Sequence, residues 1–283
     1  MKNNFNDDVS SDISQSNNQS AIAVEQSRAI QEVQGGIVMA KKFPRNETQA
    51  YAKIMEACKR TNLAKQAMYS YPKGSEKVSG PSIRLAETLA KYWGNIWFGI
   101  VELSSSEGAS EVISYAWDLE TNTKQIKQFS VKHSRYSKKN GITKLTDPRD
   151  IYEMVANQGA RRLRACILGV LPSDIIESAV EACEKTLIGD NSEPLIDRVR
   201  NCVAIFQEFG VSQEMIEKRL NHKIEATSIQ ELVALGKIYT SLRDKMAKVE
   251  DFFDLPKVQE QADQETVEEL NEKQKKLFGG KNG

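Results

Sequence analysis

A block of basic side chains between residues 124 and 164 is the part of this sequence with the clearest chemical meaning. It holds eleven Lys or Arg residues against three acidic ones, although the whole chain of 283 residues carries 39 basic and 39 acidic side chains. Clustered cations replace the counterions condensed on a nucleic-acid backbone, and aromatic rings stack on bases without reading their sequence. The block therefore predicts a surface that binds a phosphate backbone.

The second half of the block carries amides and arginines at helical spacing. At about 100° per residue, Asn157, Arg161 and Arg164 fall within about 60° of one another. Charge alone fits a solvated basic face equally well. Guanidinium groups, however, can bind phosphate with two hydrogen bonds, so the four arginines between 149 and 164 favour a phosphate-binding surface. The predicted DNA-binding residues are Lys132, Arg135, Tyr136, Lys138, Lys139, Lys144, Arg149, Asn157, Arg161, Arg162 and Arg164.

Residues suited to catalysis are few. The sequence has no G-x-x-x-x-G-K-[ST] phosphate loop, so we predict no ATP cofactor and give Mg²⁺ no role beyond an influence on DNA binding. Asp118 and Glu120 could form a metal-dependent nuclease pair, but they lie in a predicted turn, where acidic residues are routine. His133 lies on the predicted inward face of a strand and is expected to be packed or hydrogen-bonded rather than to act as a base.

Composition argues against several classes of protein. No apolar run approaches the ~18–20 residues that span a bilayer, and the polar N-terminal segment lacks the apolar region of a secretory signal. We therefore expect a cytoplasmic protein with no membrane partner. Four cysteines far apart in the sequence and two histidines predict free, buried thiols and no metal site.

The basic block must be positioned by a mixed α+β fold. Three segments with strand character, joined by short turns, predict an antiparallel β-meander of about three strands packed with helices: residues 95–103, 111–118 and 124–133. The first is continuously apolar, as in a strand buried on both faces. Residues 134–146 are expected to form a basic loop. Asp147-Pro148 then starts a helix to about Leu168, in which Gly159 allows close approach to the sheet.

Four regions follow from composition and periodicity. An Asn- and Ser-rich segment predicts disorder over residues 1–20, and the α+β core extends over residues 21–188. Residues 194–254 carry helical apolar stripes and predict a small three-helix C-terminal domain. Residues 255–283 form an acidic tail without a core-sized apolar face, which predicts a flexible segment.

The order of these motifs resembles that of phage single-strand annealing proteins of the RecT/Redβ/Erf superfamily, which share a β-β-β-α annealing core with the eukaryotic Rad-type mediator. The resemblance covers about residues 45–190. It rests on two segments that flank the β-meander: VSGPSIRLAETLAKYWGNI at 78–96 and YEMVANQGARRLRACILGVLP at 152–172. Within the second, QGARRLRACILG is similar to the A-x-x-x-A-L-[KR]-x-x-L helix that this family places behind its hairpin.

The resemblance implies ATP-independent annealing of complementary strands in phage or prophage recombination, by a ring-shaped or helical homo-oligomer and without covalent chemistry. It implies that residues 194–254 dock a phage exonuclease or the host single-strand-binding protein. Two alternatives stay open: an ssDNA-binding or adaptor protein that does not anneal, and a metal-dependent nuclease. The contacts to single-stranded DNA and annealing intermediates map onto Lys132, Arg135, Lys138, Lys139, Arg161, Arg162 and Arg164.

The net charge of zero also reflects an acidic block, because residues 250–272 hold nine acids and one Lys. We predict that this acidic stretch competes with DNA for the basic surface. Deletion of residues 256–283 should then tighten ssDNA binding at low salt, because it removes a competing polyanion. Fluorescence anisotropy with a labelled oligonucleotide measures the change, and unchanged or weaker binding would contradict the prediction.

Overall fold

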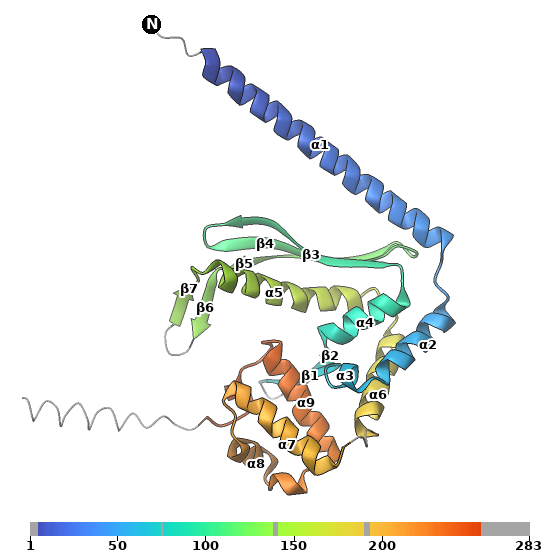
Figure 1. Cartoon of the computed structure of the whole chain (residues 1–283), viewed down its shortest axis with the longest axis vertical. Helices are drawn as coiled ribbons and strands as arrows, with labels where there is room; N and C mark the ends of the chain where they lie inside the picture. The colour runs from blue at the N-terminus through green and yellow to red at the C-terminus, as the bar shows by residue number, and fades with distance from the viewer. Residues whose placement is uncertain (1–4, 75, 138–140, 190–192, 256–283) are drawn as a thin grey trace, which may run out of the picture.

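The computed structural model describes residues 5–74, 76–137, 141–189 and 193–255, and its architecture mixes helices with antiparallel sheets (Figure 1). The main sheet has the strand order β3-β4-β5: β3 Ile96–Ser106, β4 Ala109–Asp118 and β5 Thr123–Lys132. Two further hairpins are β1 Met68–Lys73 with β2 Glu76–Pro81, and β6 Ser134–Ser137 with β7 Gly141–Lys144. The predicted α+β class with an antiparallel meander is confirmed.

Helices cover one face of this sheet and extend beyond its end (Figure 1). The helices of the first part of the chain are α1 Phe5–Lys42, α2 Glu47–Cys58, α3 Thr61–Ala64, α4 Ile83–Trp93, α5 Pro148–Leu168 and α6 Ser173–Ile188. The C-terminal part contains α7 Leu195–Phe206, α8 Gln213–Leu220 and α9 Ile229–Arg243, with the 3₁₀ helices η1 Gln207–Phe209, η2 Ile224–Ala226 and η3 Val249–Asp251.

Helix α5 lies against the inner face of the sheet. Its first turn is capped by Asp147, whose side chain accepts a hydrogen bond from the Arg149 N–H at 2.8 Å, as the Asp-Pro start predicts. A Cβ atom at Gly159 would lie 2.9 Å from Ile100 side-chain carbons, and the Ser114 hydroxyl donates to the Gly159 carbonyl at 3.0 Å. The predicted close approach at Gly159 is therefore confirmed.

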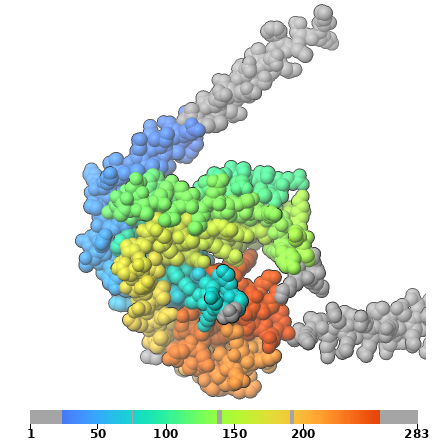
Figure 2. Space-filling model, turned by 180° about the vertical axis from the view of Figure 1, so that it is seen from behind, coloured from blue at the N-terminus to red at the C-terminus, as the bar shows by residue number. Residues whose placement is uncertain are grey.

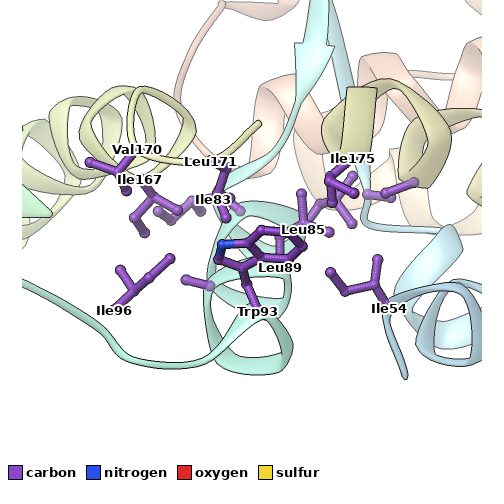
Figure 3. Close-up of a cluster of buried hydrophobic side chains, with 14 of the residues drawn as sticks. Ile54, Ile83, Leu85, Leu89, Trp93, Ile96, Ile167, Val170, Leu171 and Ile175 are labelled. Atoms are coloured by element: carbon purple, nitrogen blue, oxygen red, sulfur yellow. The ribbon is translucent and has the colours of Figure 1, made fainter. Parts of the chain in front are cut away.

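The main hydrophobic core lies where α4 meets α2, α6 and the end of α5 (Figure 3). Leu85 and Leu89 of α4 are fully buried, as is Ile54 of α2. Ile167 of α5 and Ile175 of α6 close the cluster from the other side. This core joins the helices to the end of the sheet. It therefore sets the direction in which α5 runs along the sheet.

Strand β3 is more exposed than the sequence predicts. A strand buried on both faces was expected over residues 95–103, but exposure rises along β3, and Val101 and Leu103 are 45% and 52% exposed. The reason is position: β3 is an edge strand, and α5 covers only one face of the sheet. A run of apolar residues does not distinguish a central strand from an edge.

Helix α1 also differs from the prediction. The structure places residues from Phe5 onward in one helix that projects from the body (Figure 1), whereas the sequence predicts disorder over residues 1–20. The blue part of α1 leaves the body above the sheet in Figure 2. No proline precedes Pro44, so nothing in this polar sequence interrupts helical hydrogen bonding. Near its end α1 touches the sheet, where a Cβ atom at Gly36 would lie 2.5 Å from the Trp97 ring.

Residues 134–146 contain a hairpin where a loop was expected. Strands β6 and β7 pair in register from Ser134 opposite Lys144 to Ser137 opposite Gly141. The Asn140-Gly141 dipeptide, a common hairpin-turn sequence, is the signal that the high charge of the segment obscured.

The C-terminal unit, residues 195–254, has a core of its own and docks on the first hairpin. Its core is centred on Phe206, Ile216 and Leu235, in agreement with the predicted helical C-terminal region. The Ser241 hydroxyl of α9 accepts a hydrogen bond from the Ser70 N–H at 2.9 Å and donates to the Ser70 carbonyl at 2.7 Å. The predicted acidic tail, apart from Leu255, lies outside the described residues.

Arg45 ties the segment after α1 to the end of the sheet. Its guanidinium pairs with Asp118 and, at 2.9 Å, with Glu120, and it lies 5.2 Å from the Trp93 ring centre. The side chains of Arg45 and Asp118 are 7% and 4% exposed. Burial alone would raise the pKa of Glu120, but hydrogen bonds from Asn95 and Arg45 outweigh burial and lower the pKa.

We predict that Arg45→Ala lowers the free energy of unfolding by about 3–5 kcal/mol, because Asp118 would remain buried without a cation. Urea unfolding followed by circular dichroism measures the loss. Arg28→Ala is the matched control, since the Arg28–Glu25 ion pair is exposed to solvent and should contribute little. Equal losses of unfolding free energy in the two variants would show that the buried cluster stabilises the protein no more than an exposed ion pair does.

Candidate nucleic-acid interface

Helix α5 divides its polar side chains between two sides. The periodicity that turns Gly159 and Leu163 toward the sheet places Asn157, Arg161 and Arg164 on the opposite side of the helix. There Arg164 contacts Tyr69 of β1 and Met246 of the segment after α9. We call Asn157, Arg161 and Arg164 the arginine face. The helical spacing predicted for them is confirmed.

Arg164 is held flat against an aromatic ring. Its guanidinium carbon lies 4.3 Å from the centre of the Tyr69 ring, and Nη1 donates to the Met246 sulfur at 3.3 Å. Tyr69 in turn stacks with Tyr71, with ring centres 5.9 Å apart and planes 18° apart. This arrangement fixes the guanidinium plane while using few of its strong hydrogen-bond donors.

Arg161 is half-buried, and one of its hydrogen-bond donors has no partner. Its Nε has no hydrogen-bond partner in this structure although the atom is buried. Burial lowers the pKa of Arg161, and the like charges of Arg162 and Arg164 lower it further, against smaller opposing effects of Tyr71 and Asp244. A buried unpaired donor beside two other cations is unfavourable, and a nearby anion would offset the repulsion between the cations.

The N-terminal half of this side of α5 also carries acidic residues. At about 100° per residue, Asp150 and Glu153 fall on the same side of α5 as Asn157, and the Asn157 amide donates to the Glu153 carbonyl at 2.7 Å. The positive charge is therefore concentrated around Arg161 and Arg164, near the C-terminal half of the helix.

Arg162 lies on a different side of α5 from the arginine face. Its guanidinium carbon is 4.1 Å from the centre of the Phe129 ring on β5, and Nη1 donates to the carbonyl and side-chain oxygens of Gln158 at 3.1 and 2.9 Å. These contacts give Arg162 a structural role between helix and sheet.

Lys132 and Arg149 are also separated from the arginine face. Lys132 pairs with Ala109. Burial alternates along β4, with Ser110 and Val112 buried on the face toward α5, so Ala109 and Lys132 lie on the face away from α5. Arg149 is exposed in the first turn of α5, more than two turns before Asn157. The structure thus separates predicted residues that the sequence places in one stretch.

The hairpin β6–β7 carries the remaining described residues of the prediction. Arg135 is exposed, Tyr136 is 66% exposed, and Lys144 pairs with Glu107 at 2.9 Å in solvent. The predicted Lys138 and Lys139 lie outside the described residues.

The first hairpin, which the predicted residues do not include, borders the arginine face. Tyr69 and Tyr71 alternate along β1 and so lie on one face, next to the arginines. Lys73 and Lys77 are exposed farther along the same hairpin. The alternation of rings in the sequence Met-Tyr-Ser-Tyr-Pro-Lys is the signal that places both rings on one face of this strand.

Other kinds of site have less support in the described part of the chain. Asp118 and Glu120, the pair considered for a nuclease, are both bound by Arg45. Within the described ranges, no three His, Cys, Asp or Glu side chains gather as metal ligands do. No helix in those ranges has both the length and the apolarity for a bilayer crossing. His133 is buried and hydrogen-bonded to the Ser110 hydroxyl at 2.8 Å, and the four cysteines are free and buried, both as predicted.

No protein-family model matches this chain, and no curated protein matches it. Two solved structures from Helicobacter pylori are similar to it at 12% sequence identity and a TM-score of 0.12. One is described as a "putative nucleotidyltransferase", and the match covers 71% of this chain and 97% of that one. For the other, JHP933, the match covers 70% and 93%. A TM-score this low carries no argument about fold or function, so the candidate site rests on its own geometry.

Proposed function

We propose that this protein binds single-stranded DNA and anneals complementary strands without ATP, with the arginine face as the backbone-binding surface. The observation that carries the proposal is the buried, unpartnered Nε of Arg161 beside the guanidinium of Arg164. The Nε atom itself has almost no accessible surface, so a phosphate would bind the exposed part of this half-buried side chain and compensate the adjacent like charges. Two guanidinium groups about one turn apart on a helix suit neighbouring phosphates of one strand.

Contact through the backbone is what annealing requires. A protein that holds phosphates and stacks rings on bases leaves the Watson–Crick edges free to meet a second strand. The ring of Tyr69 is buried against Arg164 and Tyr71, so it orders the arginine face and does not itself stack on bases. Tyr136, which is 66% exposed, is a ring that can stack on a base. A protein that read or covered base edges would block pairing, so this composition favours annealing over a non-annealing coat or adaptor.

The resemblance to phage annealing proteins supports the rest of the proposal. We infer a ring or helical homo-oligomer that acts in the cytoplasm of a bacterial host, with no cofactor and no covalent chemistry. The C-terminal unit docks on β1 through α9, which leaves α7 and α8 as the surfaces for a phage exonuclease or a host single-strand-binding protein. A metal-dependent nuclease has less support, because Arg45 binds both candidate carboxylates.

We predict that the purified protein accelerates pairing of two complementary oligonucleotides in the absence of ATP. Energy transfer between dyes on the two strands measures the rate, and negative-stain images of the product show whether rings or filaments form. A protein that does not bind DNA, at equal concentration, is the control. If pairing is no faster than with the control, the annealing proposal fails, and if strands bind but stay unpaired, the coat or adaptor alternative holds.

We predict that Arg161→Ala together with Arg164→Ala weakens ssDNA binding alike for all sequences and lowers the salt slope by roughly 0.7 for each phosphate that the variant no longer binds. Arg162→Ala is the matched control on the same helix, because Arg162 is occupied by Phe129 and Gln158. It should lower thermal stability while DNA affinity changes little. Unchanged affinity and salt slope in the double variant would remove the arginine face from the site.

A further inference from the structure

The hairpin β6–β7 presents an apolar pair that no described part of the chain covers. Tyr136 and Ile142 lie opposite each other in its register, and they are 66% and 77% exposed. Opposite side chains on an antiparallel pair have Cβ atoms about 4.5–5.5 Å apart, so the two form one continuous apolar surface. Neither residue belongs to a hydrophobic cluster of the described residues.

This hairpin is anchored at its base. The Leu145 N–H donates to the His133 carbonyl at 2.8 Å, and Lys144 pairs with Glu107 at 2.9 Å. From there the two strands project past the first turns of α5 (Figure 1). A two-stranded hairpin is marginally stable by itself, and a cross-strand Tyr–Ile pair adds only a small increment to its stability. Apolar surface kept on a projecting element indicates a partner.

The charges around the pair indicate the chemistry of that partner. Lys144, which also pairs with Glu107, is on the same face of the hairpin as Tyr136 and Ile142. Arg135 precedes Tyr136 on the same strand, with its side chain on the opposite face. Cations beside a flat ring and an aliphatic side chain fit a polyanion that carries flat apolar rings, which describes unpaired nucleic acid. The same hairpin flanks α5, which carries the arginine face.

We propose that Tyr136 and Ile142 form a wedge that stacks on an unpaired base of the strand bound at the arginine face. Tyr136 supplies a ring face and Ile142 an aliphatic surface beside it. The inference rests on the proposed function and adds a role for Ile142 and a preference for unpaired bases. Within a duplex, only the terminal base pair offers an open face, so the wedge favours single strands and the ends of a growing duplex.

The test combines a protein variant with a DNA variant. Tyr136→Ala with Ile142→Ala is compared with the wild type on oligothymidylate and on an abasic strand of equal length, which keeps the phosphates and lacks the bases. On oligothymidylate the variant should bind about 5- to 150-fold more weakly, with an unchanged salt slope, because stacking releases few counterions. On the abasic strand the variant and the wild type should bind alike.

Two further variants identify the cause of any loss. Tyr136→Phe keeps the ring and should retain wild-type affinity, and Tyr152→Ala removes a tyrosine of similar exposure from α5 and should change nothing. Unchanged affinity of the double variant for oligothymidylate overturns the wedge, as does an equally large loss on the abasic strand. Either result leaves the proposed function intact if the Arg161/Arg164 variant still loses binding. Impaired sedimentation with phosphatidylserine vesicles alongside unchanged DNA affinity would make the hairpin a membrane contact and also overturn the wedge.

Discussion

The close contact between α5 and the sheet is the constraint on which the arrangement of the candidate site depends. Gly159 allows this contact, since any side chain there would meet Ile100. Once that side of the helix faces the sheet, the 100° step between residues leaves Arg161 and Arg164 on the other side. There Arg164 contacts β1, because its guanidinium lies over the Tyr69 ring. A glycine that carries no chemistry thus determines where the cations lie.

Two half-buried or buried arginines of this chain show opposite electrostatic situations. Arg45 has two carboxylates and an aromatic ring, and its cluster holds the end of the sheet to the segment after α1. Arg161 has two cations beside it and an Nε without a partner. The first arrangement pairs its cation with opposite charges, and the second places like charges together. This contrast explains why the same residue type stabilises the fold in one place and suggests a binding surface in another.

The sequence predicts correctly those features that depend on residues close to one another in the chain. The Asp147-Pro148 start, Gly159 and the spacing of Arg161 and Arg164 depend on near neighbours, and the structure reproduces them. Residues that approach across the fold were invisible: the partner of Arg164 is Tyr69, far earlier in the chain. The separation of Lys132 from the arginines depends on which face of the sheet α5 covers. The exposure of β3 depends on its position at the edge of the sheet.

The hydrogen bonds between Ser70 and Ser241 join residues 171 positions apart in the sequence. A ribosome adds roughly 5–20 residues per second, so β1 emerges roughly 9–34 seconds before the helix that it binds. During that interval the backbone of Ser70 must be satisfied by water or by a transient partner. The nascent chain therefore carries β1 without its partner helix until the C-terminal unit has been made. Correct docking of α9 is therefore a late event in the biosynthesis of this protein.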